Sequence, residues 1–346
     1  MRRTTREISV GGVRVGGGAP VSVQTMANVD PHDASALAAQ VSRCAEAGCE
    51  IFRATVPDEE AAKILGEVRR KSPIPVVADV HFDYRCALAA IAYGADAVRI
   101  NPGNIGGREK IAAVARAAKE KGVPVRIGVN GGSLEKGETL VSSALKQLKL
   151  LEDEGLRDIA ISAKASNAAD TISTYRELAE KTDCPLHIGV TEAGTLIPGT
   201  VRSSVAMGVL LSEGIGDTIR VSLTAKPEKE VRVGLEILRA LGLRPPGPAV
   251  TSCPTCGRTK VDVVRVATQV EEALDMLSRD PSRNGAPLPK VAVMGCAVNG
   301  PGEAKGADIA LCGGDGEFVL YVAGVPVEKV SEEEAAGKVV EHAVVF

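Results

Sequence analysis

The side chains with the clearest chemical potential are three cysteines toward the end of the 346-residue chain. Cys253 and Cys256 form a C-x2-C pair, and Cys296 follows forty residues later. Thiolates at such spacing hold zinc or an iron–sulfur cluster. Zinc usually takes a second C-x2-C pair or a nearby histidine, and this sequence has neither before His342. The spacing alone leaves both kinds of metal centre open.

A fourth ligand for such a site could come from either of two residues. Glu303 lies seven residues after Cys296, across a Gly-Pro-Gly turn that can fold its carboxylate back toward the thiols. Cys312 lies sixteen residues after Cys296 and would complete a four-thiolate zinc site. The remaining cysteines fall in other expected elements and are interpreted as free thiols: Cys44, Cys49, Cys86 and Cys184.

A second group of polar side chains recurs at the ends of short apolar runs. In chain order these candidates are Arg53, Asp79, His81, Arg99, Asn101, Arg126, Asn130, Lys164, His187, Glu192, Arg220 and Ser222. Five of them are cations: Arg53, Arg99, Arg126, Lys164 and Arg220. Five like charges facing one site are unfavourable unless an anion neutralises them, and arginine forks match phosphate oxygens. The pattern predicts a site for a multiply charged anion, most plausibly a diphosphate.

Acid and base chemistry at this site is assigned first to Glu192. It directly follows an apolar run and lies among the cations. Asp79, His81 and Glu303 are the further catalytic candidates. Asp79 and Glu192 could instead simply pair with the arginines, and a lone histidine such as His81 or His187 serves packing as readily as function.

These side chains need a scaffold that gathers the ends of distant runs. A hairpin at Ile8–Val15 precedes eight strand candidates: Val21–Gln24, Ile51–Thr55, Pro75–Ala78, Ala97–Ile100, Pro124–Val129, Asp158–Ser162, Pro185–Val190 and Thr218–Val221. A helix candidate follows each: Asp33–Ala47, Glu59–Arg70, Tyr84–Tyr93, Arg108–Lys121, Glu138–Glu154, Asn167–Lys181, Thr200–Ser212 and Glu228–Leu241. Eight β/α units predict an α/β fold with an N-terminal TIM-type (β/α)8 barrel, active at the carboxyl ends of its strands and plugged below by the hairpin.

A proline-rich segment then divides the chain. Residues 1–242 are assigned to the barrel, 243–248 to a stiff linker and 249–346 to a small α+β unit with the cysteines. In that unit, strands are expected at Lys290–Met294, Ala307–Leu311 and Glu317–Tyr321, a polar loop at Ser278–Pro287 and a closing helix at Glu332–His342. The anion site and the cysteine site therefore belong to different domains.

The bulk composition narrows the range of partners. The net charge is −3 and aromatic residues make up 2% with no Trp, so little surface could stack on bases and no nucleic acid partner is expected. No apolar run approaches the ~18 residues that cross a bilayer, and the basic N-terminus has no apolar run behind it. We expect a cytoplasmic protein without a membrane partner, whose cysteines are thiols or ligands rather than disulfides.

Several longer motifs resemble those of one enzyme family. They are Val23–Met26, Ala78–Phe82, Arg99–Asn104, Arg126–Asn130, Thr191–Gly194, Gly214–Thr218, Cys253–Arg258 and Asn299–Glu303. Through them nearly the whole chain resembles the 4-hydroxy-3-methylbut-2-enyl diphosphate synthases of the methylerythritol phosphate route to isoprenoids, in their short bacterial form. One departure is Arg202, where the family usually has Lys.

The resemblance implies a particular reaction. The substrate would be 2-C-methyl-D-erythritol 2,4-cyclodiphosphate, whose ring is opened and whose hydroxyl is removed by two electrons from a flavodoxin or ferredoxin. It implies a [4Fe–4S] cluster on Cys253, Cys256, Cys296 and Glu303. It also implies an acid/base role for Glu192 and diphosphate contacts from Arg53, Arg99, Arg126, Lys164 and Arg220.

The direction of the last barrel helix predicts an assembly. Glu228–Leu241 runs antiparallel to the strands and ends at the face opposite their carboxyl ends, so the linker starts the small unit on that far side. We therefore expect the cysteine site of one chain to cover the barrel of another in a head-to-tail homodimer, as the resemblance also implies.

Two other interpretations fit parts of the sequence. A non-redox barrel transferase for a phosphate ligand could carry a zinc-stapled accessory domain, similar in plan to dihydropteroate synthase. An anion-binding module without catalysis would leave Glu192 and the cysteines without a role.

Overall fold

The computed structural model describes residues 2–134, 136–245, 247, 249–283, 286–298 and 300–346. They form two compact units, Met1–Arg244 and Pro245–Phe346. Among these described residues, no helix is both long and apolar enough to cross a membrane.

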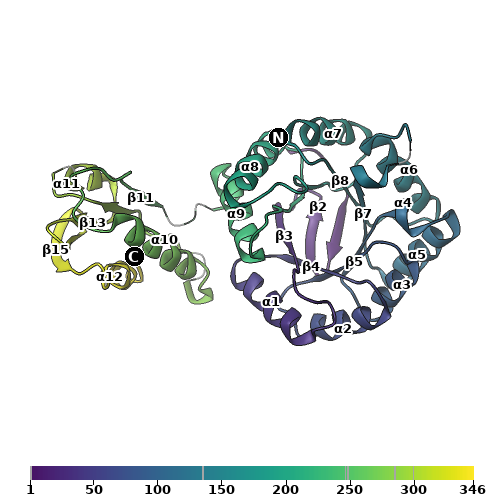
Figure 1. Cartoon of the computed structure of the whole chain (residues 1–346), viewed down its shortest axis with the longest axis horizontal. Helices are drawn as coiled ribbons and strands as arrows, with labels where there is room; N and C mark the ends of the chain where they lie inside the picture. The colour runs from purple at the N-terminus through teal and green to yellow at the C-terminus, as the bar shows by residue number, and fades with distance from the viewer. Residues whose placement is uncertain (1, 135, 246, 248, 284–285, 299) are drawn as a thin grey trace. The chain divides into compact units, whose positions relative to one another are not determined.

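The larger unit is a β/α barrel, and the smaller unit contains a small sheet, which together confirm the predicted fold class (Figure 1). The parallel strands of the barrel are β3 (Ser22–Met26), β4 (Ile51–Thr55), β5 (Val76–Val80), β6 (Ala97–Ile100), β7 (Val125–Asn130), β8 (Ile159–Lys164), β9 (His187–Ile188) and β10 (Thr218–Ile219). Their order is β8-β7-β6-β5-β4-β3-β10-β9. A ring of helices surrounds them: α1 (Ala34–Glu46), α2 (Glu59–Arg69), α3 (Tyr84–Ala92), α4 (Pro102–Ile105), α5 (Arg108–Lys121), α6 (Leu140–Asp153), α7 (Ala168–Lys181), α8 (Leu196–Ser212) and α9 (Pro227–Ala240).

Local sequence fixes where many of these helices begin. Side chains that accept a hydrogen bond from a backbone N–H of the first turn precede five of them: Asp33, Asp58, Asp83, Thr139 and Asn167. Such caps satisfy N–H groups that the helix itself leaves without partners. Behind the caps, the apolar faces of the helices pack on the outward-facing strand residues and form the main core.

The predicted hairpin is present as β1 (Glu7–Val10) and β2 (Val13–Gly16). Gly11 and Gly12 connect the strands with φ of 54° and 94°, a left-handed pair that favours glycine. The hairpin's apolar side chains pack against residues at the starts of barrel strands, among them Ile51, Val77 and Ala97. The hairpin therefore closes the end of the barrel opposite the predicted site.

The barrel closes differently between β8 and β9 from elsewhere. A single bridge between Ile161 and Leu186 joins these two strands. Beyond it, the buried Tyr175 hydroxyl accepts from Ala163 N at 3.1 Å and donates to His187 O at 2.6 Å. A side chain from α7 thus replaces the next rung of the sheet.

Some predicted boundaries in the barrel were wrong. The strands expected at Pro185–Val190 and Thr218–Val221 shorten to two residues each. At Gly189 the segments that follow β9 and β10 come so close that a Cβ there would lie 2.3 Å from Arg220 O, and the regular pairing ends before this point. Helix α8 starts four residues before the expected Thr200, because a proline is tolerated in the first turn of a helix. Helix α4 was not predicted.

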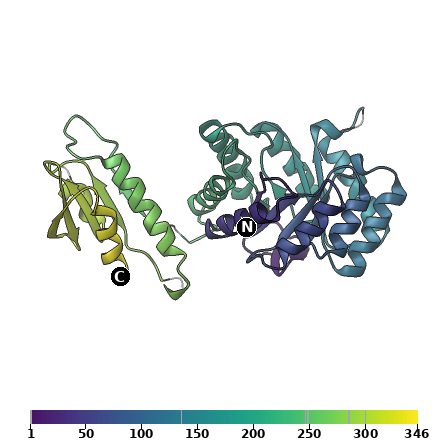
Figure 2. The same ribbon diagram turned by 60° about the horizontal axis from the view of Figure 1, so that its bottom comes forward.

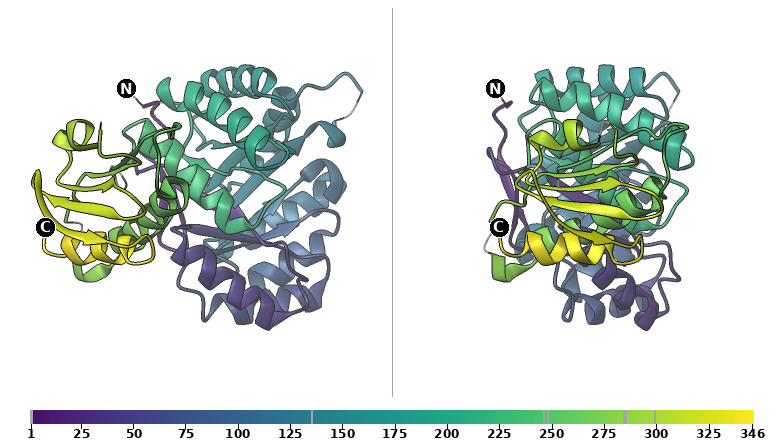
Figure 3. Two further views of the ribbon diagram at one scale, coloured as in Figure 1. Left: turned by 60° about the vertical axis from the view of Figure 1, so that its left-hand side comes forward. Right: turned by 90° about the vertical axis from the view of Figure 1, so that its left-hand side faces the viewer.

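The smaller unit is a five-stranded sheet with two longer helices on one face and a short helical segment on the other (Figures 2 and 3). Its strands, in sheet order, are β11 (Val250–Ser252), β12 (Val291–Met294), β13 (Ile309–Gly313), β14 (Phe318–Val322) and β15 (Val325–Val330). Its helices are α10 (Val263–Ser278), α11 (Gly300–Glu303) and α12 (Ala335–Ala343). Short 3-10 turns occur at η1 (Gly131–Ser133) in the barrel and at η2 (Pro281–Arg283) and η3 (Ala304–Gly306) here. Side chains of α10 and α12 share one core with the sheet.

The sequence had predicted three strands and one helix for this unit. Helix α10 was missed because its β-branched start (Val263, Val264, Val266) is more typical of a strand, yet Asp262 caps it and its buried residues recur at helical spacing. Strands β11 and β15 were also missed, because they contain few or no buried residues and so lack a clear apolar pattern. The closing helix begins at Ala335, three residues after the expected start. The expected polar loop contains η2, and residues 284–285 lie outside the described part.

Candidate active site

The carboxyl ends of the barrel strands surround a cavity of about 220 Å³, called the mouth cavity here. Eight of the predicted residues line it: Arg53, Asp79, His81, Arg99, Asn130, Lys164, Arg220 and Ser222. Met26, Gly128, Val129, Ser162 and Thr191 complete its wall. The fold thus brings side chains from β4 through β8 and from the segment after β10 to one place.

Asp79 on β5 links two arginines at the mouth. Its Oδ1 accepts from Arg99 Nη1 at 3.0 Å, and its Oδ2 lies 3.4 Å from Arg53 Nε. Burial alone would raise the pKa of Asp79, but the Arg53 charge, a hydrogen bond with His81 and the Arg99 charge hold it well below its ordinary value. Burial lowers the pKa of Arg53 to about 10. Asp79 is therefore an ionised anchor for both guanidinium groups.

Arg99 reaches the mouth past a glycine. Its Nη2 donates to Gly128 O at 3.1 Å, and a Cβ at position 128 would lie 2.1 Å from Arg99 Nε. His81 follows β5 and places its Nε2 3.1 Å from Arg99 Nη1 and 3.5 Å from Asp79 Oδ2. Gly128 thus leaves the space that the guanidinium needs.

Arg220 is held by a buried carboxylate that the sequence interpretation missed. Glu230 on α9 is 4% exposed and places both oxygens 3.4 Å from Arg220 Nη2. It also accepts from Thr25 Oγ1 at 2.7 Å and from Leu223 N at 2.9 Å. The sequence did contain a signal for this residue, because Glu230 falls on the apolar face of α9 next to Val231, and a carboxylate on a buried helix face must have a polar partner.

The other two cations have neutral partners. Arg126 on β7 donates to Gln24 Oε1, and both line a small cavity of about 30 Å³ above the hairpin rather than the mouth cavity. Lys164 Nζ lies 3.2 Å from His187 Nε2. Burial, and next the charge of Arg53, lowers the pKa of Arg126. Burial, and next the charge of Arg220, lowers the pKa of Lys164.

The charges at the mouth do not balance among the described residues. Five cations face two buried carboxylates, Asp79 and Glu230. Buried guanidinium nitrogens of Arg53, Arg126 and Arg220 have no hydrogen-bond partner. Buried donors without acceptors are unfavourable, so this arrangement favours a bound anion that accepts several hydrogen bonds.

Two predicted residues lie behind the wall of the mouth. Asn101 is 1% exposed at the start of α4, and its side-chain oxygen and nitrogen have no hydrogen-bond partner among the described residues. His187 is fully buried behind Lys164, where its Nδ1 lies 3.4 Å from Thr218 Oγ1. Burial, and next the charge of Lys164, lowers the pKa of His187 well below its ordinary value. His187 is therefore a neutral imidazole.

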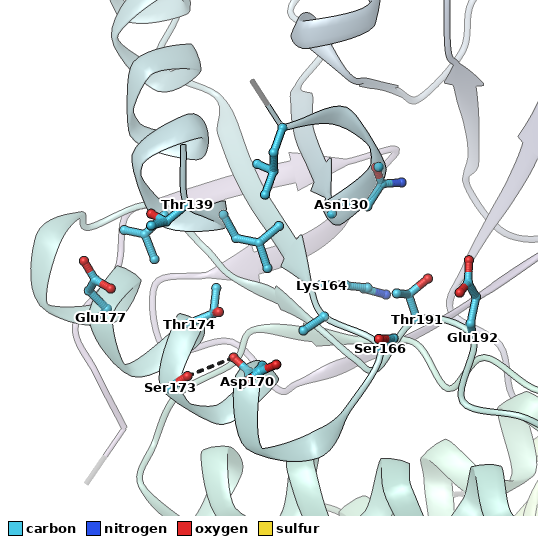
Figure 4. Close-up of a pocket in the computed structure, with 16 residues that line it drawn as sticks. Asn130, Thr139, Lys164, Ser166, Asp170, Ser173, Thr174, Glu177, Thr191 and Glu192 are labelled. Carbon is cyan, nitrogen blue, oxygen red and sulfur yellow. Dashed lines mark hydrogen bonds between the residues drawn. The ribbon is translucent and has the colours of Figure 1, made fainter. Parts of the chain in front are cut away.

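Glu192 lines a larger neighbouring cavity of about 740 Å³, called the side cavity here (Figure 4). This cavity lies between the starts of α6 and α7 and shares Asn130, Lys164 and Thr191 with the mouth cavity. Figure 4 shows Lys164 extending toward Thr191 with Glu192 beside it. Glu192 thus lies next to the mouth rather than within its wall.

The backbone at Glu192 is strained. Its φ is 52°, a left-handed value that costs a non-glycine residue about 1 kcal/mol or more. Arg202 on α8 holds the same loop, because its Nη1 donates to Ala193 O at 2.8 Å. The residue that departs from the resembling family therefore supports the loop that carries Glu192.

The three predicted cysteines of the small unit line one cavity of about 190 Å³. Cys253 Sγ accepts from Gly295 N at 3.2 Å, and Cys256 is exposed. Hydrogen bonds from the Arg258 backbone and side chain lower the pKa of Cys256. The described residues contain no group of three Cys, His, Asp or Glu compact enough to hold a single metal ion. The donor set and the size of the cavity suit a larger thiolate-bound group.

Of the two candidates for a fourth ligand, the structure describes the side chain of Cys312 but only the backbone of Glu303. Cys312 on β13 is buried in an apolar cluster with Met294 and Ala304 and does not line the cysteine cavity. Burial, and next the neighbouring Cys296, raises the pKa of Cys312 to about 11. The backbone of Glu303 ends α11, and its side chain lies outside the described part of the structure.

A barrel with a cationic mouth, joined to a separate unit with a three-thiol cavity, defines a two-domain enzyme with an anion site in one domain and a thiol site in the other. The comparisons with known proteins agree with this layout. Residues 5–235 match the GcpE TIM-barrel domain, and residues 249–344 match the GcpE protein C-terminal domain. The chain belongs to the GcpE family.

Two curated relatives illustrate the similarity. A "4-hydroxy-3-methylbut-2-en-1-yl diphosphate synthase (flavodoxin)" of Caldanaerobacter subterraneus is 53% identical, covering 96% of this chain and 94% of the relative. The protein of that name in Geobacter sulfurreducens is 51% identical, covering 97% of this chain and 96% of the relative. The family expected from the sequence motifs is thereby confirmed.

Two dihydropteroate synthase structures match about two thirds of this chain. The Yersinia pestis dihydropteroate synthase has a TM-score of 0.52 at 12% identity, covering 68% of this chain and 97% of that one. The Xanthomonas albilineans enzyme has a TM-score of 0.51 at 17% identity, covering 69% and 98%. Likeness at such identity concerns the fold only, so it does not support the transferase alternative.

Proposed function

We propose that this protein is an oxidoreductase of isoprenoid biosynthesis that reduces 2-C-methyl-D-erythritol 2,4-cyclodiphosphate to 4-hydroxy-3-methylbut-2-enyl diphosphate. Two electrons open the ring and one hydroxyl leaves as water. The names of relatives about half identical over nearly the full chain support this reaction. The observation that carries the proposal is the excess of buried positive charge at the mouth, which matches a ligand with two phosphates.

In this proposal the mouth binds the diphosphate. The cations that would contact it are Arg53, Arg99, Arg126, Lys164 and Arg220. Asn130 and Ser222 would orient the sugar-derived carbons from the cavity wall, and the buried Asn101 and His187, also predicted to bind substrate, would act from behind it. Arg53, Arg99, Lys164 and Arg220 line the mouth cavity as preorganised donors, which bind anions best, and Arg126 lies beneath it and adds its charge.

Proton transfer is assigned to Glu192. Its carboxyl group lies beside Lys164 at the junction of the two cavities, and its strained backbone is typical of a functional position. In this role it would donate a proton to the departing hydroxyl. Asp79 and His81 would act by holding Arg53 and Arg99 in place.

The electrons would reach the substrate through a [4Fe–4S] cluster on Cys253, Cys256, Cys296 and Glu303. Three thiols around one cavity, one of them with a lowered pKa and one receiving an N–H hydrogen bond, fit such a group. When bound, the cluster supplies single electrons and an iron that can accept an oxygen ligand. Glu303 is the weaker ligand of the four, and it would leave one iron open.

We further propose that the two sites meet across a head-to-tail homodimer. Arg244, the last residue of the barrel unit, donates to Val21 O and Glu50, just before β3 and β4. The chain therefore leaves at the closed end of the barrel. Nine residues to Cys253 span at most about 30 Å, and the mouth lies at the opposite end of the barrel, inside the ring of helices.

Mixing two inactive variants tests the shared site. Chains with Cys296→Ala and chains with Glu192→Ala should be inactive alone, and mixed dimers should regain activity at one of their two sites. A mixture that stays inactive despite proven subunit exchange excludes the shared site.

The reaction itself is tested with protein purified without oxygen. Metal analysis should give about four irons and four sulfides per chain. Reduced flavodoxin, the donor in the relatives' name, should support turnover of the cyclodiphosphate, and reduced ferredoxin is the second donor to try. A colourless protein with one zinc per chain and no turnover would refute the proposal.

A further inference from the structure

The Lys164–His187 pair is unlike the other cationic groups at the mouth. Lys164 is 9% exposed and His187 is fully buried. Their side-chain nitrogens lie 3.2 Å apart, and this is the only hydrogen bond recorded for Lys164 among the described residues. Arg53 and Arg99 contact Asp79 and Arg220 contacts Glu230, whereas Lys164 contacts a neutral imidazole.

The surroundings of the pair are mostly cationic. The charged and titratable groups that face it are Arg53 on β4, Arg126 on β7, Arg220 after β10, Glu230 on α9, Glu192 after β9 and Tyr175, Asp170 and Glu177 on α7. Of the carboxylates, Glu230 is committed to Arg220, and Asp170 accepts from the Asn167 side chain at the start of α7. Glu192 and Glu177 line the side cavity with Lys164 but form no ion pair with it among the described residues, so a charged Lys164 would be a buried cation without a bonded counter-ion.

Lysine and arginine respond differently to such surroundings. A guanidinium keeps its proton in proteins, whereas a buried lysine loses its proton readily. Arg126 must therefore stay charged, and Lys164 is the group that can relieve the repulsion. Burial, and next the charges of Arg220 and Arg53, lower the pKa of Lys164, in agreement with this argument.

We propose that the Lys164–His187 pair is uncharged in the empty mouth and takes up one proton when a diphosphate binds. The inference rests on the proposed function, because a diphosphate supplies the missing counter-ion. The hydrogen bond survives the change, since a neutral or a charged lysine can donate to His187 Nε2 while Nδ1–H points to Thr218. The affinity for the diphosphate then depends on pH through the protonation of this one pair.

The structure offers both a route and a support for this proton. Lys164 lines the mouth cavity and also the larger side cavity, which gives the proton a second path to the pair. The Tyr175 hydroxyl fixes the backbone at Ala163 and His187, directly adjacent to the pair. A Cβ at Gly189 would lie 3.0 Å from Lys164 Nζ, so the glycine leaves room for the ammonium group.

The sign of the pH effect follows from linkage. The pKa of the pair is low in the empty site and rises when the anion binds. Between those two values, binding takes up a proton, and the association constant should fall about tenfold for each unit of rising pH. Below the lower value the pair is already charged, and above the upper value it stays neutral, so the dependence vanishes at both ends.

Titration calorimetry on the anaerobic holoenzyme without electron donor tests the proposal. The cyclodiphosphate is a suitable probe, because each phosphorus carries one ester and one anhydride bond and keeps a single strongly acidic oxygen that stays ionised throughout this pH range. At one pH and in buffers of different ionisation enthalpy, the wild type should take up about one proton per bound ligand. Lys164→Arg, which keeps the charge permanently, should take up none. Lys149→Arg makes the same substitution at an exposed lysine of α6, outside both cavities, and is the matched control that should behave as the wild type.

The outcomes separate this inference from the proposed function. Binding heats that are identical in all buffers, or an uptake unchanged in Lys164→Arg, would overturn it. If Lys164→Arg binds too weakly to titrate, the pH dependence of the wild-type dissociation constant decides, and a flat profile overturns the inference. If the cyclodiphosphate neither binds nor turns over, the proposed function fails, and inorganic sulfate, also ionised throughout, tests the proton uptake by itself.

Discussion

The two candidate sites of this protein differ in how completely the chain builds them. At the mouth, Asp79 holds Arg53 and Arg99, and Glu230 holds Arg220, all within strand ends or on a packed helix. At the cysteine cavity, Cys256 is exposed in a turn where Thr255 has a φ of 63°. The described residues there form no compact metal-binding group.

The difference has a physical origin. Phosphate is bound by preorganised hydrogen-bond donors, so its site is rigid before the ligand arrives. Thiolate ligands repel one another and are drawn together by the metal itself, so folding of a metal site is coupled to metal binding. The barrel should therefore tolerate loss of the cluster, whereas the small unit should depend on it. Each variant below tests this contrast.

Cys296→Ala should have the largest effect. The loss of one thiolate ligand should abolish the cluster and lower turnover by more than about a thousandfold. Because the mouth is built independently, calorimetry should still detect cyclodiphosphate binding within about tenfold of the wild-type affinity. Cys312→Ala is the matched control in the same unit and should retain both iron and activity. Equal loss of iron in both variants would contradict the assigned ligand set.

Tyr175→Phe should lower the free energy of unfolding of the barrel without removing any side chain that lines the mouth cavity. It leaves Ala163 N and His187 O buried without their shared partner, at a cost of about 1–3 kcal/mol. The melting temperature of the barrel should fall by several degrees while the iron content stays unchanged. Tyr93→Phe, at a partly exposed position, should leave the melting temperature within about one degree. A similar shift in both variants would mean that the hydroxyl bridge is unimportant.

Glu230→Gln should lower kcat without weakening the binding of the substrate. The amide still accepts from Leu223 N but no longer fixes Arg220 by charge, so kcat should fall about tenfold. Removing a negative charge should not weaken the binding of an anion, so the dissociation constant should stay equal or decrease. The neighbouring Glu228→Gln, which breaks an outer pair with Arg43, is the control. Equal losses in both variants would exclude a positioning role for Glu230.

The sequence predicted the barrel and most of the mouth for a definable reason. Polar residues at the ends of apolar runs must meet at one face once the strands are parallel, and eight of them do. Glu230 could not be found in this way, because it comes from a helix and reaches the mouth through tertiary packing. Tyr175 was missed for the same reason, since its hydroxyl acts in the sheet from α7.

The small unit was less predictable. Its longest helix opens with β-branched residues, and packing against α12 and the sheet overrides that local preference. The C-x2-C spacing located the cysteines correctly but left zinc and iron open, because both metals use the same thiolate geometry. The choice of iron in the proposed function rests on family membership, which reflects the whole chain and not the spacing.

Arg202→Lys should have the smallest effect, and it tests how firmly the loop of Glu192 must be held. A lysine at this position can still donate one hydrogen bond to Ala193 O, so activity should stay within about threefold of the wild type. Arg202→Met removes the donor and should lower kcat by about two- to tenfold, the worth of one hydrogen bond of about 0.5–1.5 kcal/mol. Neither change should alter iron content, because the loop belongs to the barrel. If Arg202→Met were as active as Arg202→Lys, the left-handed conformation of Glu192 would be maintained by the loop itself, and the mouth would be even more preorganised than its contacts indicate.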